Sequence, residues 1–147
     1  MKRLSLVLLV VTAIILACHG QAAAQCVGHS QLSLTNLWQL YVNRDTSSGF
    51  SWIRMQVLVS NTGVIQSGTT AKDSAGVAYT VTGGSLILNV TNCKVSGKIL
   101  IKPTGAVTPT QIDVVHTTLS LDDHTIMGVG FIAGKPITLM GVRVNTL

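Results

Sequence analysis

The chain has one pair of adjacent carboxylates, Asp122 and Asp123, and a histidine, His124, follows them directly. Carboxylates and imidazoles build metal sites and acid–base catalysts, but they also suit the turn of a β-hairpin. If the acids form the turn, His116 lies on the opposite strand roughly 17 Å from His124, whereas metal–ligand bonds are about 2 Å long. The pattern therefore predicts a structural turn. A functional role for Asp122 or Asp123 would require contact with a group from another loop at the same end of the fold.

Three lysines form a second candidate site on a predicted strand, residues 94–102. Lys94, Lys98 and Lys102 recur at every fourth position, so their side chains line one strand face over roughly 26 Å. This strip is either a solvated outer face that discourages edge-to-edge pairing or a contact for an anionic surface. Lipopolysaccharide, phospholipid and acidic glycan are the surfaces that would fit the second interpretation.

Aromatic residues gather early in the chain, mostly within residues 38–52. Arg54 is expected on the same strand face as Trp52 and Phe50, which predicts an aromatic–guanidinium patch. Such residues either plug one end of a core or line the mouth of a ligand pocket. The candidate ligand-binding residues are Trp38, Trp52, Arg54 and His116.

Signatures of an enzyme are missing from the sequence. It contains no Gly-x-Ser-x-Gly elbow, no glycine-rich phosphate motif and no EF-hand loop. We therefore predict no catalytic residue, no bound metal and no cofactor, and we favour a protein that is not an enzyme.

The first 24 residues resemble a secretory signal peptide. Lys2 and Arg3 precede an apolar stretch of 14 residues, 4–17, which is short for a membrane span of roughly 17–25 residues. Ala22 and Ala24 then supply the small residues of a cleavage site. We predict cleavage after Ala24, which leaves residues 25–147 as a single β domain that is secreted or periplasmic.

A second processing route would end at Cys18. Residues 15–18 match a loose bacterial lipobox, so Cys18 could become the lipidated first residue of a membrane-anchored protein. The cleaner site after Ala24 favours simple secretion, and a lipid anchor at Cys18 is the one membrane contact that the sequence suggests.

Cys26 and Cys93 remain after cleavage, and an even pair in an exported domain predicts a disulfide. In the loop-entropy picture this link stabilises the fold by about 4 kcal/mol. His29 follows Cys26 by three positions, but one Cys-x-x-His with a single distant cysteine is a weak metal pattern.

The formal net charge is +5 and falls to +3 without Lys2 and Arg3. Glutamate is absent, so the Glu–Lys pairs that decorate exposed helices are absent too, which disfavours helices. The modest positive charge of an exported domain does not indicate a nucleic-acid partner.

Alternating apolar and polar residues, interrupted by turns, predict about nine strands. Gly83 and Gly84 are expected to form a tight hairpin turn, and residues 71–76 a loop. Glycines at 97, 128, 130 and 141 fall inside strand patterns, where they mark bends of the sheet. The expected strands cover residues 32–43, 50–60, 64–68, 77–82, 85–91, 94–102, 111–121, 124–132 and 137–145.

This pattern predicts an all-β fold, a single small antiparallel up-and-down barrel, with a β-sandwich as the alternative. The layout, a tryptophan near the start and then hairpins such as the one at Asp122–Asp123, is broadly similar to lipocalin-like and avidin-like barrels. The resemblance implies a barrel and no particular ligand.

Together these features predict an exported β-domain of the cell envelope or extracellular space. We expect a non-enzymatic binding or structural module whose partner is a small molecule, a glycan or an envelope component. The alternative is a barrel carrier or enzyme with an interior pocket, where His116 or Asp113 would act. An interior filled by valine, isoleucine and leucine would count against that alternative.

Overall fold

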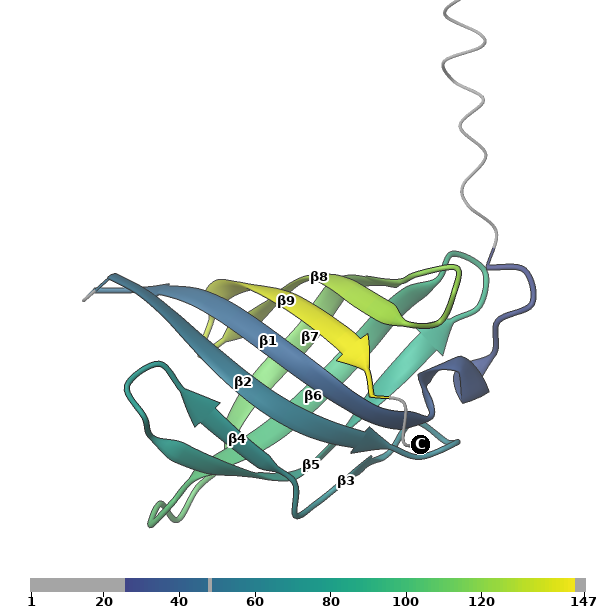
Figure 1. Cartoon of the computed structure of the whole chain (residues 1–147). Helices are drawn as coiled ribbons and strands as arrows, with labels where there is room; N and C mark the ends of the chain where they lie inside the picture. The colour runs from purple at the N-terminus through teal and green to yellow at the C-terminus, as the bar shows by residue number, and fades with distance from the viewer. Residues whose placement is uncertain (1–25, 48, 145–147) are drawn as a thin grey trace, which may run out of the picture.

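Residues 26–47 and 49–144 are described by a computed structural model (Figure 1). Their nine strands form one antiparallel sheet in the order β1-β9-β8-β7-β6-β5-β4-β2-β3, and β1 also pairs with β2. The β1–β2 pairing closes eight strands into a barrel, to which β3 adds beside β2. The prediction of a small antiparallel barrel is therefore confirmed over the sandwich alternative.

One short 3₁₀ helix, η1, precedes the strands and lies at one end of the barrel (Figure 1). We call this end the η1 end; the β1–β2 and β8–β9 turns lie at the opposite end. The elements are η1 (Gln31–Leu34), β1 (Asn36–Thr46), β2 (Gly49–Val59), β3 (Ile65–Gln66), β4 (Thr70–Asp73), β5 (Ala78–Asn89), β6 (Lys94–Pro103), β7 (Thr110–Leu119), β8 (Thr125–Ile132) and β9 (Lys135–Arg143).

The barrel interior is a packed apolar core. Successive side chains of a strand point to opposite faces, so every second residue turns inward. On β2 this row is Ile53, Met55, Val57 and Val59, and each is at most 1% exposed. Inward apolar residues of the other strands are at most 6% exposed. The inward apolar side chains of the described strands therefore form one core cluster inside the barrel.

The expected hairpin at Gly83–Gly84 is wrong, because both glycines lie inside one continuous strand, β5. The register of β5 against β6 shifts between Val81 and Gly83, which marks a bulge rather than a turn. Gly84 has φ +131°, and a Cβ there would lie 2.2 Å from the Lys98 carbonyl oxygen. Glycine therefore allows the close backbone approach at this bend of the sheet. A glycine pair is equally typical of a tight turn, so the sequence pattern is the same for both.

Two other expectations need correction. Residues 31–34 form η1 rather than the start of a strand, because the Ser30 side chain accepts the Leu32 N–H and caps the helix. The expected loop 71–76 contains most of β4, which the core holds through Ala71 and Asp73.

The predicted signal segment, with Cys18, lies outside the described residues. Within 26–47 and 49–144, no helix is long and apolar enough to cross a membrane.

Candidate functional site

Trp38 plugs the η1 end of the barrel and is fully buried. Its indole N–H donates to the Leu34 carbonyl over 2.8 Å, and the Arg143 guanidinium lies 5.3 Å from its ring centroid. Arg143 also donates to the carbonyl of Ser33 in η1. A buried indole held in this way cannot contact a partner, so Trp38 leaves the set of candidate binding residues.

The remaining candidates do not form one cluster. Trp52 and Arg54 lie together with Phe50 on the outer face of β2, as predicted. His116 is exposed on the outer face of β7, across from Val129 of β8, and therefore does not line the interior. Asp113 is half-buried on β7 and accepts a hydrogen bond from the Gln111 side chain over 2.6 Å.

The lysine strip lies on the outer face of β6. Lys94 and Lys98 are exposed and Lys102 is half-buried, while the alternate residues face the core. Lys98 is in register with Asp113 on β7, so an opposite charge stands beside the strip at its centre. The strip therefore carries mixed charge at its centre rather than positive charge alone.

A different part of the outer surface carries exposed apolar side chains. They lie on β8, β9 and β2, which the neighbouring β1 connects in the sheet. Contiguous exposed apolar surface is uncommon on soluble proteins and usually marks a contact. The apolar face consists of Phe50, Trp52, Met127, Val129, Phe131, Met140 and Val142, which are between 38% and 68% exposed.

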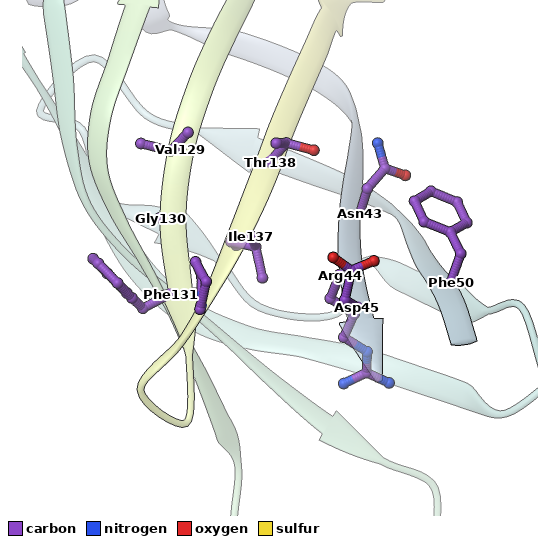
Figure 2. A pocket seen from close by; sticks show the side chains of 10 residues that line it. Asn43, Arg44, Asp45, Phe50, Val129, Gly130, Phe131, Ile137 and Thr138 are labelled. Carbon is purple, nitrogen blue, oxygen red and sulfur yellow. The ribbon is translucent and has the colours of Figure 1, made fainter. Parts of the chain in front are cut away.

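A groove of about 410 Å³ opens on this face, at the end of the barrel opposite η1. Figure 2 shows Phe131 and Phe50 on its two sides, with Asn43, Asp45 and Thr138 between them in the view. We call this hollow the groove, and its end of the barrel the groove end. Its remaining lining residues are Arg44, Val129, Gly130, Pro136 and Ile137.

Strand register explains how the groove combines aromatic and polar groups. Asn43 pairs with Thr138 on β9 on one side and with Trp52 on the other, and Asp45 pairs with Phe50 on β2. Side chains directly opposite each other on an antiparallel pair lie close together. Apolar ring faces therefore stand beside an amide, a carboxylate and a hydroxyl, which can stack on and hydrogen-bond one ligand.

The groove end also holds polar groups inside the barrel. The Tyr79 hydroxyl donates to Asp73 Oδ2 over 2.8 Å, and Asp73 Oδ1 accepts the N–H groups of Ala75 and Val77. Burial, then the hydrogen bond and charge of Asp73, raise the pKa of Tyr79, while Arg44 opposes the shift. The Nε atom of Arg44 is buried without a hydrogen-bond partner among the described residues.

The sequence carries one signal of this interior cluster. Arg44 continues the inward row of Trp38, Leu40 and Val42 on β1, so period-two counting places it inside. Asp73 lies within residues 71–76, which the sequence predicts to be a loop, so its inward position is not predicted.

The disulfide is confirmed, with the Sγ atoms of Cys26 and Cys93 2.13 Å apart. The turn at Asp122 is also structural: its carboxylate accepts bonds from the Ser120 hydroxyl and the His124 N–H, which lower its pKa. Asp123 behaves differently, because its Oδ1 lies 2.5 Å from Nδ1 of His29. Asp123 therefore contacts His29, which belongs to another segment at the η1 end.

Comparisons with models of known protein families, with characterised proteins and with solved structures found no match for this chain. The class of this protein is therefore described by its fold and its groove alone. The protein is a disulfide-linked antiparallel β-barrel with a packed interior and an aromatic groove on its outer surface.

Proposed function

We propose that this chain is an exported, non-enzymatic binding module of the cell envelope or extracellular space, and that the groove binds a glycan. The observation that carries the proposal is the mixed lining of the groove. Sugar rings present apolar C–H faces and hydroxyl edges, so they need flat apolar walls and hydrogen-bonding side chains together. Phe50 and Phe131 supply the walls, and Asn43, Asp45 and Thr138 supply the polar groups. The volume of 410 Å³ suits a small ligand.

Export is supported by two independent features. A disulfide persists in oxidising compartments and is rare in the cytosol. The predicted signal peptide, residues 1–24, precedes the first disulfide cysteine directly. A secreted or periplasmic barrel would meet glycans of the envelope at its outer surface.

Calorimetric titration with chitotriose and maltotriose tests the proposal. We expect one of the two to bind, and Phe50→Ala or Asp45→Asn to weaken that binding at least tenfold. Ile87→Ala and Asp122→Asn are matched controls, because Ile87 is an exposed apolar residue on β5 and Asp122 is an exposed carboxylate of the β7–β8 turn at the η1 end. Equal affinity of the groove variants and the controls, or no binding of either sugar, would contradict the proposal.

A carrier for small anions is the second candidate, and the buried unpartnered Nε of Arg44 favours it. A carboxylate that reached the end of the interior would satisfy this donor beside Tyr79 and Asp73. Benzoate is the probe: binding that shifts the amide signals of Tyr79 and Asp73 but spares Phe50 would support the carrier over the groove.

A further inference from the structure

Three separate segments bring metal-binding side chains together at the η1 end. Cys26 and His29 come from the segment before η1, Cys93 from the β5–β6 turn and Asp123 from the β7–β8 turn. The two sulfur atoms and a ring nitrogen of His29 all lie within 4.8 Å of one another. The sequence alone gives no reason to join Asp123 to this group, since it lies 94 positions from His29.

A carboxylate contacts one ring nitrogen of His29. Its side chain is only 8% exposed, and Nδ1 is 2.5 Å from Asp123 Oδ1, which leaves Nε2 for a metal. A carboxylate on the far nitrogen is the usual partner of a zinc-bound histidine, because it fixes the ring and raises its basicity. A disulfide needs neither group, so the covalent link does not account for this partly buried pair.

The backbone keeps the turns in place around the sulfur atoms. The Leu119 N–H at the end of β7 donates to the Cys93 carbonyl over 2.9 Å, so the β5–β6 turn is tied to the strand that leads to Asp123. Cys26 precedes the first helix, and a surface hollow of about 230 Å³ lies between Cys26, Val27, Val90 and Thr91. Solvent and ions therefore reach Cys26 from one side.

We propose that the reduced form of this protein binds one zinc ion through Cys26, Cys93 and His29, with Asp123 as the carboxylate that orients His29. An external dithiol would reduce the link: its thiolate attacks one Sγ, the S–S bond breaks, and the second thiol completes exchange. The dithiol becomes a disulfide, and both electrons pass to the cysteines. Zinc then replaces the two thiol protons, because only thiolates are ligands.

In the oxidised form the sulfur atoms bind each other and carry no charge, so the disulfide and the zinc site exclude one another. Tetrahedral zinc with sulfur ligands at about 2.3 Å places two sulfurs about 3.8 Å apart. The Cα atoms of the cysteines are 4.9 Å apart, and Cys26 lies outside the barrel strands, so the segment before η1 can supply this separation.

Cobalt and zinc titrations of the full chain, oxidised and phosphine-reduced, test the proposal. We expect the reduced protein to bind one Co²⁺ with the sulfur-to-metal charge-transfer and tetrahedral d–d absorption of a two-thiolate site, and Zn²⁺ to displace it. The oxidised protein should show neither signal. His29→Asn and Asp123→Asn should each weaken binding 10–100-fold, as loss of a ligand or its carboxylate partner commonly does.

Two neighbouring residues of the same turn are the matched controls. His124→Asn and Asp122→Asn should leave the affinity within twofold of the unmodified chain. Absence of stoichiometric binding to the reduced protein, or equal affinity of His29→Asn, would overturn the proposal. If reduction unfolds the chain, zinc must restore its β-sheet circular dichroism in the unmodified protein but not in His29→Asn, and failure to restore it overturns the proposal too.

Discussion

The two ends of the barrel differ in how they are closed. At the η1 end a buried tryptophan, a disulfide and a helix close the interior, and the Trp38 indole N–H donates to the Leu34 carbonyl. At the groove end aromatic side chains remain exposed, and a buried Arg44 nitrogen lacks a partner among the described residues. Buried polar atoms without a hydrogen-bond partner among the described residues also occur at the η1 end, at Thr35 Oγ1 and Arg143 Nε, so the exposed aromatic side chains and the groove are what distinguish the two ends.

Replacement of the two tryptophans is the largest test of this contrast. We expect Trp38→Ala to lower the free energy of unfolding by about 3–5 kcal/mol, because a fully buried ring leaves a cavity. Trp52→Ala, at 38% exposure on the apolar face, should cost less than half as much. Urea unfolding measures both, and equal losses would break the proposed difference between the two ends.

Removal of the disulfide should have the next largest effect. The link spans 67 residues, so Cys26→Ala/Cys93→Ala should lower the free energy of unfolding by about 4 kcal/mol. The groove lies at the other end, and its ligand affinity should stay within twofold wherever the variant is folded. Loss of binding by folded protein would show that the ends are coupled.

Tyr79→Phe tests the polar interior of the groove end. Loss of its hydrogen bond to Asp73 should lower stability by about 1 kcal/mol at neutral pH. Because folding raises the pKa of Tyr79 above 10.0, its contribution is present below that pH and disappears as pH rises through the folded value. Unfolding curves from pH 8 to 11 should therefore converge for the two proteins, and a constant difference would contradict this assignment.

The smallest effect concerns the β7–β8 turn at the η1 end. The Ser120 hydroxyl and the His124 N–H lower the pKa of Asp122 below 3.8, so its contribution is present above that pH and lost as pH falls through the folded value. Asp122→Asn should thus be slightly less stable near neutrality and equal to the unmodified protein in strong acid. NMR titration of the Asp122 carboxyl carbon measures the shift, and a pKa at or above 3.8 would refute it.

The sequence predicts the barrel and the disulfide well because both depend on local or simple signals. The alternation of apolar residues along Ile53–Val59 follows from the two-residue period of a strand. Only two cysteines remain after the predicted cleavage, so each can form an intrachain disulfide only with the other. Gly83–Gly84 predicts a hairpin turn but forms a bend within β5, because glycine is favoured both in tight turns and where two backbones approach closely. The His29–Asp123 pair could not be foreseen, since contacts between distant turns depend on how the barrel closes.

The groove could not be predicted from the sequence either. Phe50 and Phe131 lie on strands far apart in the chain, and only the closing of β1 against both β2 and β9 places them around one hollow. Counting along single strands found the Phe50–Trp52–Arg54 row but not its partners on β8 and β9.

The most direct test of the account is a map of amide chemical shifts during titration with chitotriose and maltotriose. The account predicts that the sugar that binds shifts signals of Asn43, Asp45, Phe50, Phe131 and Thr138, while signals around Lys94, Lys98 and Lys102 and at the η1 end stay in place. Shifts centred on the lysine strip or the η1 end, or no shifts with either sugar, would contradict it.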